Sequence, residues 1–273
     1  MKPGIVLAAL FVSFLLCVGC GSSSSSAPHS SITNGNWSFT GTSTVTSGLV
    51  LSIGGGLAQS GNVVSGTMLV SASNANCQSL FTSGIPVTGT FSGDTLTLTS
   101  ANFSNQIVTV NAAGSGNSLT GTYSVAGGCA DGDKGTIAAS YLPPITGTWT
   151  GTFMNPDGTV IPIDPNNPRE GVETARLTLT QSATATDGYF PLSGTFETSF
   201  SCLGSGTIFG AGNAYVMGTS VVIRGAGVGE LIYDALLVEA PVGSANGPMI
   251  GGVAPLSANS CRTTALLNLT RLP

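Results

Sequence analysis

The sequence predicts an all-β protein built from two tandem antiparallel up-and-down β-barrels. Three observations predict this fold: apolar and polar residues alternate with a period of two, turn dipeptides recur at short intervals, and one series of motifs occurs twice in the 273 residues. Hydrophobic residues make up 41% of the chain, which is enough for packed cores. Closing each sheet into a barrel removes its exposed edges, and a pair of β-sandwiches is the alternative fold.

Residues 1–19 have the order of a bacterial lipoprotein signal peptide. Lys2 gives a positive start, and the apolar run that follows is too short to span a bilayer comfortably. The segment Leu16-Cys17-Val18-Gly19-Cys20 then resembles the lipobox of bacterial lipoproteins, in which small residues precede a diacylated Cys. The resemblance implies lipidation of Cys20, although Cys17 stands where that family usually has Leu. An ordinary secretory signal cleaved nearby is the alternative.

Residues 20–33 form a Ser-rich segment that predicts a flexible tether to the membrane. In the lipoproteins that the signal resembles, Asp directly after the lipidated Cys marks retention in the inner membrane. Gly21 stands there, so we expect an outer-membrane anchor with the body on the periplasmic or surface face. The single histidine, His29, lies in this tether, which excludes most histidine-based nucleophile and zinc chemistry from the body.

Two copies of one unit follow, at residues 34–142 and 145–273, with a hinge expected at Pro143-Pro144. The Gly-Thr dipeptide recurs throughout both copies. Each copy has, in the same order, a Trp, a Gln, a Ser-Gly-Thr motif, two cysteines and a final strand. The matching pairs are Trp37 and Trp149, Gln59 and Gln181, "SGT" at 65–67 and 193–195, Cys77 and Cys202, and Cys129 and Cys261.

Within the first copy, the period of two predicts eight short strands. The segment "TLTLTS" at 95–100 places Leu on one face and Thr on the other, as in a half-buried strand. Gly-Asp and Gly-Asn dipeptides supply turns between strands. The run at 230–240 is ambiguous, and its place in the repeat favours a strand. The expected strands lie near residues 36–43, 48–58, 63–71, 86–92, 94–100, 105–112, 118–125 and 135–141.

The two copies resemble the calycin-type barrels of lipocalins and avidins. The matching residues are Gly35 with Trp37, Gly147 with Trp149, "LTGTY" at 119–123 and "PLSGTF" at 191–196. The resemblance implies that Trp37 and Trp149 plug one end of each barrel, and ligand contact is the alternative role for them. An eight-stranded interior holds either side chains or one small ligand.

Four cysteines remain in the body, and export would place them in an oxidising compartment. Three pairings are possible, and the symmetry of the copies selects Cys77 with Cys129 and Cys202 with Cys261. Each disulfide would contribute about 4 kcal/mol in the chain-entropy model. With no Cys-x-x-Cys pair and no histidine in the body, we expect neither a metal site nor a catalytic thiol.

Charged residues offer little that predicts chemistry. Residues 131–135, "DGDKG", resemble the start of a calcium loop but lack its later ligands, so a tight turn is expected. The insertion at 155–173 carries four carboxylates on a Pro-rich loop, where solvated surface charge is favoured over a cation site or acid/base pair. Arg224 lies within the apolar strand "VVIRGAG", where its charge would need a partner if the side chain pointed inward and none if it pointed outward. The four carboxylates are Asp157, Asp164, Glu170 and Glu173.

These observations favour a non-catalytic interaction module of the cell envelope. We expect no catalytic residue, no metal and no cofactor, because no such motif can be placed on the chain. The net charge of −5 and the lack of a basic stripe exclude nucleic acid as a partner. The expected partners are the membrane, through the lipid anchor, and an envelope protein or glycan. A carrier of a small apolar ligand inside a barrel is the alternative function.

Overall fold

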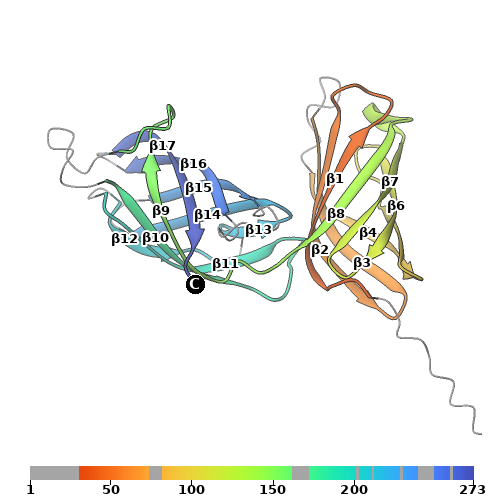
Figure 1. The fold of residues 1–273 in the computed structure, drawn as a ribbon, viewed down its shortest axis with the longest axis horizontal. Helices are drawn as coiled ribbons and strands as arrows, with labels where there is room; N and C mark the ends of the chain where they lie inside the picture. The colour runs from red at the N-terminus through yellow and green to blue at the C-terminus, as the bar shows by residue number, and fades with distance from the viewer. Residues whose placement is uncertain are drawn as a thin grey trace, which may run out of the picture.

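A computed structural model describes residues 31–73, 82–161, 172–200, 203–210, 212–227, 230–238, 249–258 and 261–273. Within these residues the regular elements are strands, apart from one 3-10 turn, η1 (Gly128–Ala130). The strands form two closed antiparallel sheets that lie side by side (Figure 1). The prediction of tandem β-barrels is therefore confirmed. The signal peptide and most of the tether lie outside the described residues.

The first barrel has eight uninterrupted strands, each antiparallel to the next. β8 pairs with β1, so the ring closes without a free edge. The strands are β1 (Gly35–Ser43), β2 (Val50–Ser60), β3 (Val63–Ser73), β4 (Thr82–Ser92), β5 (Thr95–Ser100), β6 (Ile107–Ser115), β7 (Ser118–Ala126) and β8 (Lys134–Leu142). All eight expected strands are present.

The turn between β4 and β5 sets how these two strands pair. Gly93 and Asp94 have φ angles of 57° and 62°. Two successive positive φ angles characterise the type I′ turn, whose twist matches that of paired strands. The "GD" dipeptide therefore fixes the register in which Phe91 pairs with Leu96, both facing the core.

The second barrel closes in the same order with one strand broken in two. β12 and β13 both lie between β11 and β14, so they are halves of one strand interrupted at residues 209–214. β9 pairs with β10 and β17, and β10 also pairs with β11, which closes the ring. The strands are β9 (Gly147–Met154), β10 (Thr174–Gln181), β11 (Phe190–Thr198), β12 (Ser205–Ile208), β13 (Tyr215–Met217), β14 (Ser220–Gly227), β15 (Glu230–Val238), β16 (Met249–Ala258) and β17 (Cys261–Arg271).

Inward side chains fill the interior of each barrel with an apolar cluster. The first cluster is built around Trp37, Phe39 and Phe91, and the second around Trp149 and Tyr233. All five side chains are fully buried. The Tyr233 hydroxyl lies 3.0 Å from the carbonyl oxygen of Ile250 and 2.5 Å from that of Leu267, so this polar atom is satisfied inside the core. The described part of the ambiguous run at 230–240 is confirmed as a strand, β15 (Glu230–Val238).

Candidate functional site

The paired Trp and Gln motifs close the first barrel at the end where β1 begins. The indole Nε1 of Trp37 donates to the carbonyl oxygen of Thr33 at 2.7 Å. The backbone N–H of Ile32 donates to Oε1 of Gln59 at 2.9 Å. The chain segment before β1 is thereby tied to the ends of β1 and β2, with Ile32 buried.

The second barrel repeats this arrangement. Nε1 of Trp149 donates to the carbonyl oxygen of Ile145 at 2.8 Å, and the N–H of Ile145 donates to Oε1 of Gln181 at 3.0 Å. The exposed fraction of both Trp side chains, Trp37 and Trp149, is 0%. Both indoles thus lie among core side chains with their polar atoms already bonded, which leaves them no surface for an outside ligand.

Two of the four body cysteines, Cys129 and Cys261, are among the described residues. Cys129 is in η1, between β7 and β8, where its Sγ lies 3.5 Å from Nε2 of Gln106. Cys261 begins β17, and Cys77 and Cys202 lie outside the described residues. In an up-and-down barrel the connection β3–β4 leaves the same end as β7–β8. The topology is compatible with the expected pairs, and the pairing stays a prediction.

Asp133 has a structural setting that the sequence did not reveal. It is buried and accepts hydrogen bonds from Ser43 Oγ at 2.5 Å and from the Tyr123 hydroxyl at 2.8 Å. Burial, and next the hydrogen bond and charge of Asp133, raise the pKa of Tyr123 above its ordinary value. Asp131 accepts from the N–H of Gly127 at 2.6 Å. These contacts belong to a turn before β8.

The acidic insertion does not gather its described carboxylates. Asp157 is exposed, and the hydroxyl and N–H of Thr159 donate to it, which lowers the pKa of Asp157. Glu173 is buried and accepts from Ser199 Oγ. Asp164 and Glu170 lie outside the described residues. In the part of the chain that the structure describes, no group of three or more His, Cys, Asp or Glu side chains is placed to hold a metal ion.

A close junction joins the two barrels beyond the linker at Pro143-Pro144. The buried side-chain amide of Asn36, on β1, donates to the carbonyl oxygen of Gly218 at 2.9 Å and accepts from the N–H of Gly218 at 2.8 Å. The N–H of Gly56, on β2, donates to the carbonyl oxygen of Gly188 at 3.1 Å. The expected hinge is therefore braced by hydrogen bonds far from it in the sequence.

Glycines let the two backbones approach at this junction. A Cβ atom at position 54 would lie 2.6 Å from Cα of Gly218, and one at position 56 would lie 2.9 Å from Cβ of Ala185. Real side chains do not tolerate such distances, so the Gly54–Gly56 triplet is needed for contact. Three apolar side chains are buried here outside both core clusters: Leu69, Phe190 and Met217.

Beside the junction lies a groove of about 760 Å³. We call it the junction groove. Its floor is the outer face of β13 to β16. Across this floor, Ser220 on β14 lies opposite Leu236 on β15, and Leu236 lies opposite Gly251 on β16. One wall comes from the first barrel through Leu69, and Tyr189 and Tyr215 line the groove with ring centroids 5.2 Å apart. Both barrels thus contribute to one cavity.

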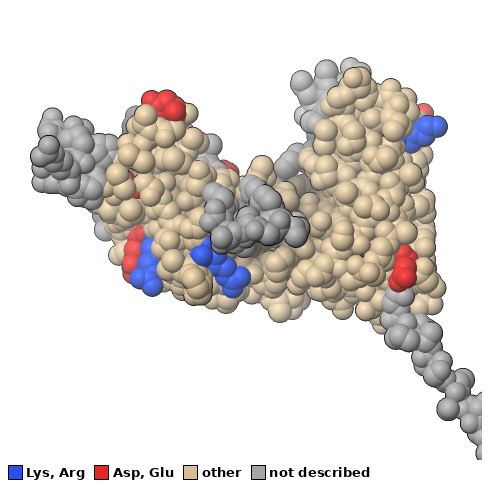
Figure 2. Space-filling view, in the orientation of Figure 1, with Lys and Arg blue, Asp and Glu red and all other residues tan. Residues whose placement is uncertain are grey.

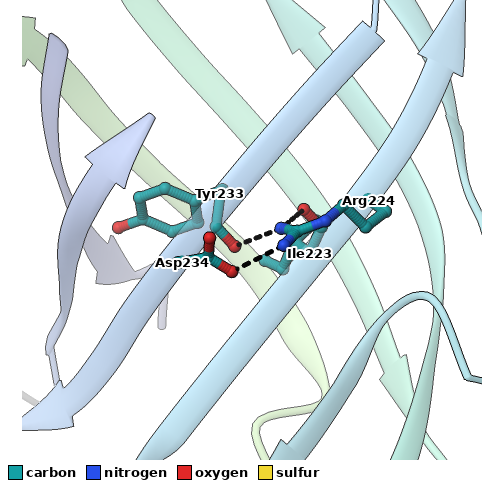
Figure 3. Close-up of polar contacts among 4 residues, drawn as sticks. All are labelled: Ile223, Arg224, Tyr233 and Asp234. Atoms are coloured by element: carbon teal, nitrogen blue, oxygen red, sulfur yellow. Dashed lines mark hydrogen bonds and ion pairs between the residues drawn. The ribbon is translucent and has the colours of Figure 1, made fainter. Parts of the chain in front are cut away.

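The junction groove also contains an ion pair. Figure 3 shows the Arg224 guanidinium reaching from β14 to β15, where Nη2 lies 2.9 Å from Oδ1 of Asp234 and Nη1 lies 3.5 Å from the Tyr233 carbonyl oxygen. Arg224 therefore points outward, yet it has a partner. Charged side chains are sparse on the face of the molecule drawn in Figure 2.

Sequence reasoning missed the junction and its groove. Two signals were present: three consecutive glycines inside an expected strand, and a connection between Gln181 and Leu192 that is longer than its counterpart after Gln59. Glycine inside a strand often marks a close approach of another backbone. None of the site residues expected from the sequence lines the groove. Arg224 does line it, but the sequence did not indicate a site there.

Comparison with known proteins gives no family for this chain. No protein-family model matches the sequence, and no curated protein does. A solved structure from Nitrosomonas europaea, described as a "putative ATTH", aligns over 87% of this chain and 92% of its own, with 9% identity and a TM-score of 0.24. That likeness is too distant to indicate a shared function. Among the described residues no helix has the length and apolar character to cross a membrane.

Proposed function

We propose that this protein is a lipid-anchored, non-catalytic binding module of the bacterial cell envelope, and that it binds through the junction groove. The observation that carries the proposal is the groove itself, which is lined by both barrels and has the size of a small-molecule site. Sites between domains are a common location for ligands, because two rigid walls can enclose one molecule.

The anchor in this proposal is an acylated Cys20 followed by the Ser-rich tether. The order of charged start, apolar run, small residues and Cys supports it. With Gly21 after the Cys, we propose sorting to the outer membrane, with the module facing the periplasm or the surface.

The barrel interiors are the less favoured binding place. Their inward positions carry large side chains that pack against one another, including Trp37 and Phe91 in the first barrel and Trp149 and Tyr233 in the second. A ligand would have to displace these side chains. The alternative function, a carrier with its ligand inside a barrel, therefore has less support than binding at the junction.

A non-catalytic role fits the polar residues that line the groove. The charged residues among the described lining are Arg224 and Asp234, and each is engaged by the other. Ser220 lies on the same face, but general-base catalysis needs a base within hydrogen-bond reach of such a hydroxyl. Asp234 is two register rows away on β15 and holds Arg224 instead.

Native mass spectrometry of the body, residues 27–273, purified from its own host tests this proposal. This body contains every described element, including both closed barrels and the junction. Leu236→Glu places a charge in the groove, and Val63→Glu is the matched control, since both side chains are exposed, at 56% and 58%. Wild type and Val63→Glu should retain or capture one envelope component that Leu236→Glu loses. Equal behaviour of all three proteins would contradict binding at the groove.

The anchor has a separate test in the full chain. Metabolic labelling with a palmitate analogue should mark the wild type and not Cys20→Ser, because the acyl group needs the Cys thiol. Equal labelling of the two proteins would contradict the lipid anchor and would leave the proposal of binding at the groove unaffected.

A further inference from the structure

We infer that the junction groove takes an uncharged, mainly apolar small molecule that carries a hydrogen-bonding group at one end. This inference rests on the proposed function and names the ligand class of the same site. It depends on three features of the groove: its difference from the matching face of the first barrel, its charge balance and its shape.

At the floor of the groove, the outer face of the second barrel carries Val222 and Leu236 beside its ion pair, whereas the first barrel carries Thr and Asn at the compared positions. On β5 and β6, the outward pair in register is Thr97 and Asn111, whose side chains hydrogen-bond at 3.3 Å. On β14 and β15, at the same positions in the ring, Val222 pairs with Asp234, and Leu236 projects outward beside them. Val222 and Leu236 both line the junction groove, together with Met217 and Leu69, so they form one apolar surface and are not scattered singly.

The walls of the groove continue this apolar surface. Leu69 points away from the core of the first barrel and Met217 lies at the tip of β13, and both are buried at the junction. Tyr189 and Tyr215 add two rings tilted by 45° to each other. A tilted pair leaves no parallel slot for a flat ring between them, so their role is to present apolar ring surface to the ligand.

The charge balance of the groove favours an uncharged ligand. Arg224 and Asp234 neutralise each other at 2.9 Å, and they are the charged residues among the described lining. An anionic or cationic ligand would enter an apolar site without an unpaired countercharge, which is costly. A hydroxyl, carbonyl or amide can instead hydrogen-bond to the exposed carboxylate of Asp234 or to the guanidinium at little electrostatic cost.

The dimensions of the site fit one small molecule. A volume of about 760 Å³ falls within the range of pockets that enclose most of a ligand's surface. The floor spans β13 to β16, which is roughly 14 Å at the usual spacing between strands. The ion pair stands beside Val222 on this floor, and the apolar wall of the first barrel lies toward Met217, so a ligand would have a polar and an apolar end.

Two fluorescent probes with one aromatic skeleton test the inference on residues 27–273. N-Phenyl-1-naphthylamine is uncharged, and 8-anilino-1-naphthalenesulfonate adds a sulfonate. The uncharged probe should bind with a stoichiometry of one and at least about tenfold more tightly than the sulfonate, because the site offers no free cation. Leu236→Glu should weaken the uncharged probe by about tenfold or more, whereas Val63→Glu should not.

A charge-unpairing variant supplies a second readout. Asp234→Asn leaves Arg224 without its carboxylate, so the preference for the uncharged probe should fall by about tenfold as the sulfonate gains a partner. Equal binding of both probes to wild type, unchanged by Asp234→Asn but lost in Leu236→Glu, would overturn the ligand class and leave the groove as the site. Binding that Leu236→Glu does not alter would overturn the groove, and with it the proposed function. No binding of either probe would overturn the ligand class alone.

Discussion

The first barrel reaches closure with eight unbroken strands and short connections, whereas the second reaches the same ring with a split strand and longer connections. Gly61 and Asn62 suffice to join β2 to β3, but residues 182–189 join β10 to β11. The split between β12 and β13 occurs at the fourth position of the ring, where β4 is continuous. The ring topology therefore tolerates insertions that leave its pairing order intact.

What the two barrels share is the set of contacts that closes one end. Gly35 and Gly147, with φ angles of 141° and 143°, precede the two tryptophans. A Cβ at either position would lie 2.9 Å from a side chain of the closing strand, the Tyr141 ring in one barrel and the Arg271 guanidinium in the other. The glycine of the Gly-x-Trp motif is thus required in both copies by its positive φ angle, and in the first copy the Tyr141 ring adds a steric requirement.

Several of the differences between the two barrels lie at the junction. The longer β10–β11 connection supplies Gly188, which accepts a hydrogen bond from the first barrel, and the turn after β13 supplies Gly218. The apolar outer face that lines the junction groove belongs to the second copy as well. The comparison teaches that the two barrels share the residues that close one end, while the features of the binding proposal lie in residues that differ between them.

The largest effect is expected from removing either indole. Trp37→Ala and Trp149→Ala should each lower the free energy of unfolding of their own barrel by about 3–5 kcal/mol, since each leaves a large cavity in a packed core. Urea unfolding followed by circular dichroism measures the loss. Trp→Phe at the same positions, which keeps most of the ring volume, should recover a large part of it. A loss in only one barrel would break the structural equivalence of the two motifs.

A smaller effect, specific to the junction, is expected from Gly54→Ala. The new Cβ would meet Gly218 of the other barrel at 2.6 Å, so the barrels must separate at a cost of about 1–3 kcal/mol while each stays closed. Small-angle X-ray scattering should show a larger radius of gyration, and the groove probe should be released. Gly210→Ala is the control, because its nearest contact would be an ordinary 3.7 Å. An unchanged scattering curve would contradict the described junction.

Asn36→Ala should loosen the same junction without a steric clash. The substitution leaves the buried N–H and carbonyl oxygen of Gly218 without their partner, which costs about 1–3 kcal/mol. Hydrogen exchange at the Gly218 amide should accelerate, whereas exchange in β5 and β6 should not. The control, Asn117→Ala, removes an exposed hydrogen bond to Thr33 and should leave Gly218 protected.

The sequence could predict the barrels because their signals are local. Alternation in "TLTLTS" and the Gly93-Asp94 turn each act within a few residues, and the order of Trp and Gln in both copies could be read directly. The ring closure between β1 and β8 followed from counting strands. These features depend on backbone geometry and on which face of a strand is apolar.

The junction could not be predicted in the same way because its contacts span most of the chain. Asn36 and Gly218 are 182 residues apart, and in a chain with 39 glycines a Gly triplet is weak evidence. A further signal lies in "VVIRGAG" at 221–227, where Val222 is an apolar residue at an outward position of the strand. Val222 lines the junction groove, so this outward apolar residue lies beside the first barrel.

The smallest expected effect concerns the two glutamines. In each barrel the Gln side chain accepts from one backbone N–H, that of Ile32 or Ile145, and both Gln side chains are only half-buried, so water can replace much of the bond. Gln59→Ala and Gln181→Ala should each lower the free energy of unfolding by about 1 kcal/mol.

The sharper measurement is hydrogen exchange, in which the amide of Ile32 should lose protection in Gln59→Ala and the amide of Ile145 in Gln181→Ala. Gln→Glu keeps the acceptor oxygen and should preserve that protection in both barrels. If Gln59→Ala exposes its amide while Gln181→Ala does not, the ends of the two barrels are held by different contacts, and the equivalence of the copies stops at the tryptophans.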